Sequence, residues 1–267
     1  MNQPTRHNSQ SLEHQKILIL TPVKDAAIYV ESYFRGLQNL TYDKRLISIG
    51  ILESDSIDDS HEIYSKACSA YSSQFRDIRL FKKDFGFRIP ADIPRWEPMV
   101  QFKRRAILAR SRNHLLFYAL DDEDWVLWLD VDVIQFPQNI IEKLLSFGKD
   151  ILHPHCVKVL GGPSFDRNAW GDHGRVCMDE MRNGQELVPL DAVGGTMLFV
   201  RADCHRDGLI FPPFLYGKHN PKVRERSDIF MPGELGELET EGLGILAADM
   251  RIQCWGLPNL EIIHADL

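Results

Sequence analysis

The stretch DWVLWLDVDVIQFP, residues 124–137, places two acidic residues directly after an apolar run. The run VLWL at 126–129 shows no alternation of polar and apolar residues, which is typical of a strand buried on both faces. Asp130 and Asp132 follow it with one residue between them. Because an ionised carboxylate is costly to bury without a partner, we expect both side chains at the strand's exit, facing water or a cation.

Length and composition favour a single domain over residues 16–267, preceded by a disordered polar tail at 1–15. The net charge of −7, from 38 acidic and 31 basic residues, gives no basic footprint and argues against a nucleic-acid partner. The five cysteines are odd in number and lack C-x-x-C spacing, which favours a reducing compartment over a disulfide framework or a zinc site. No apolar run approaches the ~20 residues that cross a bilayer, so we expect a soluble, cytoplasmic protein.

Strands and helices alternate in the first half of the chain. Strands are expected at 16–23, 46–53, 77–85 and 124–129. Amphipathic helices are expected between them at about 27–40, 56–75 and 100–120. This alternation predicts an α/β fold with a mostly parallel sheet flanked by helices, in which ligands bind outside the carboxyl ends of the strands. The two aspartates lie at such an end.

The second half is less regular. Helices are expected at 139–147 and 239–250, and strands at 150–159, 194–203 and 259–267. Three segments rich in Gly, Pro or polar residues are expected to be loops, at 86–98, 161–184 and 211–228. We expect the first and the third of them to be mobile.

Asp130 and Asp132 are candidate metal ligands. Carboxylates supply the oxygen ligands that Mg²⁺ and Mn²⁺ prefer, while phosphates and waters complete the coordination shell. A solvated turn or a helix cap is the alternative for so short an acid pair. The buried run that leads into the pair favours the metal site.

Other candidates follow from their place in the predicted sheet. Thr21 and Pro22 end the first strand and Asp55 follows the second, positions from which such a sheet grips a base and ribose. Strand termination and helix capping are their alternative roles. The helix at 100–120 carries four arginines, one of which could hold a phosphate: Arg104, Arg105, Arg110 and Arg112. We select Arg110 among them, and Asn113 as a further nucleotide contact, against the alternative of a solvated basic face.

Several sequence blocks occur in an order that resembles a known family. They are ILILTPVKDAA, LISIGILESDSIDDS, RRAILARSRN, DWVLWLDVDVIQFP, VPLDAVGGTMLFVRADCHRDGLIFPPF and ETEG. Together they resemble the fungal Anp1/Mnn9/Van1 mannosyltransferases, with the likeness running from Lys16 to His264. The departures are a missing membrane anchor and stem, a short chain, and Lys24 where the family has Arg.

The resemblance implies a GT-A glycosyltransferase fold and the transfer of α-mannose from GDP-mannose to a mannoside, glycan or glycolipid, with retention of configuration. It also implies a divalent cofactor, Mn²⁺ or Mg²⁺, and His264 as a third metal ligand beside Asp130 and Asp132. Mn²⁺ accepts imidazole together with carboxylates, which suits this mixed set.

The resemblance further implies roles for residues at the sugar end of the site. Asp191, Glu239 and Glu241 are catalytic candidates, one of which would bind donor hydroxyls or the acceptor; the two glutamates could equally be partners of a helix dipole. Gly194 and Gly195 would let the backbone approach a sugar, although a bulge also uses glycine. The full set expected to bind the nucleotide sugar is Thr21, Pro22, Lys24, Asp25, Asp55, Arg110, Asn113, Asp130, Gly194 and Gly195.

Two alternatives stay open. The chain could be a UDP-sugar transferase on the same fold, since D-x-D recognises the diphosphate and not the base. It could also be a catalytically silent subunit that binds a nucleotide or a sugar. Either alternative is compatible with homo- or hetero-oligomerisation and with peripheral membrane contact. If the chain is a trimmed fungal domain, we expect it in the Golgi lumen.

Overall fold

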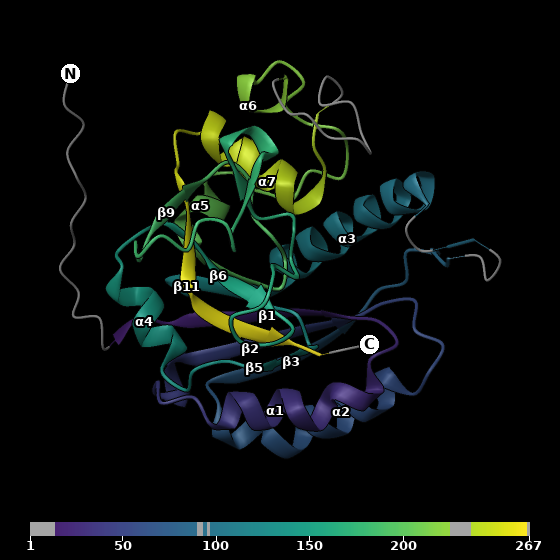
Figure 1. Cartoon of the computed structure of the whole chain (residues 1–267). Coiled ribbons are helices and arrows are strands. Elements are labelled where there is room, and N and C mark those ends of the chain that lie inside the picture. Colours follow the sequence, from purple (N-terminus) through teal and green to yellow (C-terminus); the bar gives the residue numbers. More distant parts are fainter. Residues whose placement is uncertain (1–13, 90–92, 95–96, 225–235, 266–267) are drawn as a thin grey trace.

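The computed structural model describes residues 14–89, 93–94, 97–224 and 236–265. Its centre is one nine-stranded sheet with helices on both faces (Figure 1), which confirms the predicted α/β architecture. The polar tail expected at 1–15 lies outside the described residues apart from its last two positions, and so do parts of the loops expected at 86–98 and 211–228.

One half of the sheet is parallel, in the order β3-β2-β1-β4. The strands are β1 (Ile17–Val23), β2 (Ile47–Glu53), β3 (Asp77–Lys82) and β4 (Trp125–Leu129). The helices that connect them are α1 (Val30–Gln38), α2 (Ser60–Tyr71) and α3 (Pro98–Ala119). In Figure 1, α1 and α2 lie on one face of the sheet and α3 on the other.

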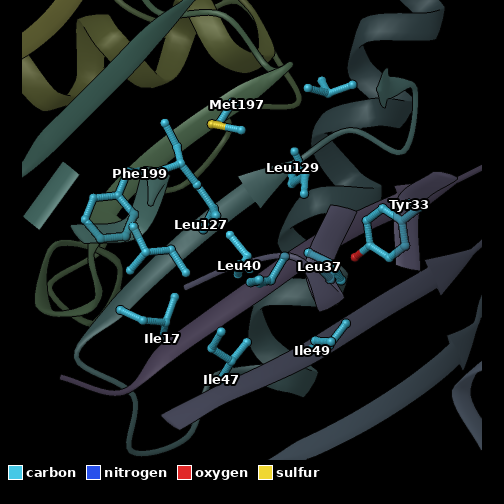
Figure 2. Packing of buried hydrophobic residues seen from close by; sticks show 14 of the residues in the cluster. Ile17, Tyr33, Leu37, Leu40, Ile47, Ile49, Leu127, Leu129, Met197 and Phe199 are labelled. Carbon is cyan, nitrogen blue, oxygen red and sulfur yellow. The ribbon is translucent and has the colours of Figure 1, made fainter. Parts of the chain in front are cut away.

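Alternate residues of β4 belong to different layers of the core, as the period of a strand requires. Leu127 packs in the layer between the sheet and the helices α1 and α2, together with Ile17 of β1 and Leu37 of α1 (Figure 2). Trp128 points to the opposite layer, which contains Leu115 of α3. Both faces of β4 are therefore covered, and the first polar side chain able to reach solvent comes after its end.

The other half of the sheet is mixed. β10 (Met197–Arg201) runs antiparallel between β4 and β6 (Ile151–Val157), and β11 (Cys254–His264) runs parallel to β6. The remaining strands are β5 (Val133–Gln135) and β9 (Val188–Leu190), both paired with β11, and the separate pair β7 (Trp170–Gly171) and β8 (Val176–Cys177).

The helices of this half are α4 (Ile140–Ser146), α5 (Ala202–Arg206), α6 (Pro221–Arg224) and α7 (Glu239–Asp249). Short 3₁₀ turns are η2 (Ala27–Tyr29), η3 (Lys44–Leu46), η4 (Ser72–Gln74) and η5 (Asp172–Gly174). No helix in the described parts of the chain is long and apolar enough to span a membrane.

The last strand differs from its predicted extent because it begins at Cys254 rather than near 259. Gly256 and Pro258 weaken the strand pattern at this point. The structure explains the glycine, since a Cβ at Gly256 would come within 2.5 Å of the Met178 sulfur. The strand extends through this segment because β9 and β6 pair with it on either side.

Candidate active site

A cleft of about 430 Å³ lies at the carboxyl edge of the parallel half of the sheet. Its walls are the segments that follow β1, β2, β3 and β4, together with one side of α3. The structure brings together six of the residues predicted for the site, namely Pro22, Lys24, Asp25, Asp55, Asp130 and Asp132. The predicted position of the site at the strand ends therefore corresponds to a real concavity.

The D-x-D aspartates follow β4 directly and line the cleft. The Asp130 backbone N–H donates to the Thr196 carbonyl (2.9 Å), and the Asp130 carboxylate accepts from Arg112 Nη2 (3.0 Å). Desolvation raises the pKa of the Asp130 carboxyl to about 6, against the opposing effect of Arg112 and with a further upward contribution from Asp132. Asp130 is thus held in place by a cation of the protein itself.

His264 ends β11 and faces the second aspartate. Its Nε2 lies 3.1 Å from Asp132 Oδ2, and its Nδ1 lies 2.7 Å from the Ala265 carbonyl oxygen. Because a carbonyl can only accept, Nδ1 carries a proton. Burial lowers the pKa of His264, but Asp132 more than offsets this and the net shift is upward. Nε2 and the carboxylate therefore need a second proton or a cation between them.

This donor set fits a hard divalent cation. Among the described residues, no three His, Cys, Asp or Glu side chains already surround one point. Asp132 and His264 nevertheless face each other, with Asp130 beside them at the strand exit. Two or three protein ligands suit Mn²⁺ or Mg²⁺, which take their remaining ligands from phosphate and water. The prediction of His264 as a metal ligand stays a prediction that this geometry favours.

Asp55 and Lys24 hold a loop against the cleft. The Asp55 carboxylate accepts from the backbone N–H groups of Phe85 (3.0 Å) and Gly86 (2.8 Å). Lys24 Nζ donates to the Phe87 carbonyl (2.8 Å). Both residues line the cleft. Their hydrogen bonds also fix the segment after β3, and that segment limits the space available to a ligand.

Asp25 has a similar role, while Thr21 lies deeper. Asp25 Oδ1 accepts from the Ile57 N–H (2.7 Å), which ties the segment after β1 to the segment after β2. Thr21 is fully buried and shares a hydrogen bond of 2.8 Å with the Tyr33 hydroxyl. Thr21 does not line the cleft, whereas Pro22 does. Of the two predicted residues at the end of β1, only Pro22 is therefore available to a ligand.

Arg112 of α3 was not selected from the sequence, yet it lies at the centre of the site. It is only 3% exposed. Its Nη2 donates to Asp130 Oδ1 (3.0 Å) and its Nε to Glu239 Oε1 (3.2 Å), so one guanidinium joins the D-x-D motif to the start of α7. The guanidinium also lies over the rings of Trp128 and Phe211, at 5.7 and 5.5 Å from their centroids.

The two residues selected on α3 have other positions. Arg110 is exposed and is not part of the cleft wall. Asn113 is buried, and its side-chain amide donates to the Phe211 carbonyl (2.7 Å) and accepts from the Phe211 N–H (2.9 Å), so it fixes a backbone segment. The sequence did contain a signal that Arg112 is buried, because Arg112 lies three residues after Ala109 and four before Leu116 on the buried stripe of α3.

Glu239 and Glu241 are engaged with arginines of α3. Glu241 is 2% exposed, and its carboxylate pairs with Arg105 Nη2 (2.5 Å) and accepts from Trp170 Nε1 (2.8 Å). Glu239 is paired with Arg112 and adopts a positive φ of 51°. Neither glutamate lines the cleft. Glu239 at the start of α7 is linked to Asp130 of the D-x-D motif through Arg112, which donates to both carboxylates.

The adjacent glycines make room for protein side chains. A Cβ at Gly194 would lie 2.0 Å from Asp166 Oδ2, and one at Gly195 would lie 2.6 Å from Arg112 Nη2. Asp166 accepts from the N–H groups of Gly195 (2.8 Å) and Thr196 (3.2 Å). Burial alone would raise the pKa of Asp166, but the nearby His153 and the backbone N–H groups of Thr196 and Asn168 hold it well below the usual range. These glycines are needed whether or not a sugar approaches them.

Asp191 lies outside the cleft wall. Its carboxylate pairs with Lys222 Nζ (2.6 Å) and accepts from the His173 N–H (3.0 Å). The structure therefore does not bring Asp191 together with the D-x-D motif, and an ion pair with α6 accounts for its position.

Comparison with solved structures identifies the fold. A mannosyltransferase from Pyrobaculum calidifontis, in complex with GDP-Man and Mn²⁺, matches with a TM-score of 0.55 at 12% identity over 94% of this chain and 57% of that one. GalNAc-T7 with UDP, GalNAc and Mn²⁺ matches with a TM-score of 0.57 at 10% identity, over 94% of this chain and 44% of that one. The predicted GT-A fold is confirmed.

Sequence comparison identifies the family. The Anp1 subunit of mannan polymerase II from Schizosaccharomyces pombe is 28% identical over 94% of this chain and 64% of its own length. The mnn9 subunit of the same organism is 26% identical over 99% of this chain and 84% of its own length. The Saccharomyces cerevisiae Anp1 subunit is 28% identical, and the chain spans 55% of it. Since a sequence model of the Anp1 family also matches residues 1–177 and 172–215, this chain belongs to the Anp1 family.

Proposed function

We propose that this chain is a metal-dependent glycosyltransferase that moves α-mannose from GDP-mannose to a carbohydrate or glycolipid acceptor with retention of configuration. The observation that carries the proposal is the cleft at the carboxyl edge of the sheet, which Asp130 and Asp132 line, with His264 Nε2 3.1 Å from Asp132. The names of the relatives as mannan polymerase subunits, and of one structural neighbour as a mannosyltransferase with GDP-Man and Mn²⁺, support this choice of donor.

The chemistry of sugar transfer explains why this arrangement is suitable. When the bond between the sugar and the diphosphate breaks, negative charge grows on the leaving group and must be neutralised. Mn²⁺ or Mg²⁺ held by Asp130, Asp132 and His264 would supply that neutralisation. Arg112 keeps Asp130 in position, and the hydrogen bonds of Asp55 to the segment after β3 fix the wall on the nucleotide side.

Glu239 and Glu241 are assigned a positioning role in this proposal. Their carboxylates are buried and paired with Arg112 and Arg105, so they hold α7 against α3. Protein cations already neutralise both acids, so we assign neither of them to contact with the sugar. This assignment replaces the expectation that one of them binds donor hydroxyls.

The test is a transfer assay with labelled GDP-mannose, UDP-glucose and UDP-GlcNAc against mannoside acceptors, with and without Mn²⁺. Transfer or hydrolysis that is specific for GDP-mannose supports the proposal. Specificity for a UDP-sugar would reassign the donor. GDP binding without any transfer would point to a silent subunit, a role compatible with the relatives' description as subunits of complexes. We propose hetero-oligomerisation with a related subunit on the same ground.

A further inference from the structure

Two consecutive residues of α3 that line the cleft carry buried polar atoms without partners in the described part of the chain. Ser111 is 2% exposed and Arg112 is 3% exposed, and both residues line the cleft. Within the described part of the chain, Ser111 Oγ and Arg112 Nη1 have no hydrogen-bond partner. Buried donors of this kind are rare in folded proteins, because the loss of hydration is not compensated. Such a pair indicates that an acceptor is missing.

The rest of the Arg112 guanidinium is already fixed by the protein. Nε donates to Glu239, and Nη2 donates to Asp130 and more weakly to the Gly195 carbonyl (3.4 Å). Because a guanidinium is planar, these contacts also determine the direction of Nη1. Nη1 is therefore a donor held in advance of binding, beside the carboxylate that begins the D-x-D motif.

Ser111 provides the second donor. A serine inside a helix usually bonds to the carbonyl four residues earlier, yet no such bond forms at Ser111. Its hydroxyl proton can rotate to meet an acceptor. A hydroxyl and a guanidinium that line the same cleft are donors that phosphate oxygens accept, since one donor carries charge and both are N–H or O–H groups.

We propose that Ser111 and Arg112 form a phosphate subsite that binds the diphosphate of the nucleotide sugar from the α3 side of the cleft. The subsite lies beside Asp130, so the same diphosphate would meet a cation of the protein on one side and, on the other, the divalent cation that the D-x-D aspartates would hold. This inference rests on the proposed function, because it assumes that the cleft takes a nucleoside diphosphate. It assigns the phosphate contact to Arg112 and not to Arg110.

The test is calorimetric titration of the full chain with GDP, UDP, inorganic pyrophosphate and guanosine, with and without Mn²⁺. Ser111→Ala removes one donor without leaving a buried charge, and we expect it to weaken GDP and pyrophosphate about 3- to 10-fold while guanosine binding is unchanged. Arg110→Gln is the matched control, because it removes a charge from the same helix outside the cleft. Its diphosphate affinity should stay within about twofold of wild type.

Removing Arg112 alone would leave the buried Glu239 carboxylate with the more distant Arg105 Nε (3.9 Å) in place of its nearer partner, so the contribution of Arg112 is measured in a Glu239→Gln background. We expect Glu239→Gln combined with Arg112→Gln to bind pyrophosphate roughly 10- to 100-fold more weakly than Glu239→Gln alone. Unchanged diphosphate binding in both Ser111→Ala and the double variant would overturn the subsite and leave the proposed donor intact. Wild-type binding of UDP and not GDP, with the same losses in the variants, would support the subsite and overturn the donor.

Discussion

The two walls of the cleft satisfy their charged groups in different ways. On the wall formed by the segments after β1 and β2, the carboxylates of Asp25 and Asp55 accept from backbone N–H groups of neighbouring loops. On the wall formed by α3, Arg112 is paired with Glu239 of α7, and Arg105, also of α3, is paired with Glu241. A substitution on the first wall loosens a loop, whereas one on the second leaves a charge buried without its partner.

The largest effect on stability is expected from Arg112→Met, which removes the ion pair between Arg112 and Glu239 on the second wall. Glu239 would lose a partner at 3.2 Å while only 4% exposed, and breaking such a pair costs about 3–5 kcal/mol of unfolding free energy. Urea denaturation measures the loss. Combining this change with Glu239→Gln should recover part of it, because the carboxylate left with the longer 3.9 Å contact to Arg105 Nε is then removed. A loss below about 1 kcal/mol in the single variant would show that the pair is solvated and that the two walls do not differ.

The next largest effect is expected on sugar transfer, and it tests the D-x-D motif that follows β4. Asp132→Ala removes the carboxylate that faces His264, and we expect turnover to fall by roughly 10²- to 10³-fold, as when a preorganised electrostatic group is lost. The fold should persist because Asp132 contributes no packing to the two core layers. Circular dichroism and Mn²⁺ titration accompany the assay. Wild-type turnover in Asp132→Ala would remove the D-x-D motif from the site.

The first wall and the D-x-D motif are the parts of the site that could be predicted from the sequence. Asp55, Asp130 and Asp132 follow buried strands, and parallel strands bring their carboxyl ends to one edge of a sheet. Strand ends can be located from apolar runs alone. Each of these residues therefore lines the cleft, as does Pro22 at the end of β1.

The second wall could not be predicted in the same way, because its pairs join distant segments. Arg112 and Glu239 are separated by 127 positions, and nothing local shows that they meet. Asp166 lies in the loop expected at 161–184, where no periodic pattern distinguishes it, yet it fixes the turn at Gly195. Arg110 was selected instead of Arg112 because both are arginines of the same helix. Only the position of the buried stripe relative to the sheet shows which of them is exposed and which is buried.

A smaller effect is expected on the first wall from Asp55→Asn. The amide keeps one oxygen for the N–H of Phe85 or Gly86 and presents an N–H₂ to the other, so one backbone donor loses its acceptor. We expect a loss of about 1–3 kcal/mol of unfolding free energy. Asn tolerates the positive φ of 56° at this position, so backbone strain is not a competing cause. Hydrogen exchange should locate the change at residues 85 and 86, and exchange that is unchanged there would contradict it.

The smallest effect is expected from Glu241→Gln, and it decides between two accounts of α7. If Glu241 bound the sugar, turnover would fall strongly while GDP affinity stayed nearly constant. The structure instead shows its carboxylate between Arg105 and Trp170, and the Gln oxygen can still accept from one of them. Arg105 is 19% exposed on its side chain and so keeps access to water, which limits the loss to about 1–2 kcal/mol of unfolding free energy. We therefore expect turnover within about threefold of wild type at a temperature well below unfolding. Steady-state kinetics and urea denaturation of the same preparation measure both quantities. A roughly hundredfold slower turnover without loss of stability would place Glu241 at the sugar and would mean that the ion pairs of the second wall open during the reaction.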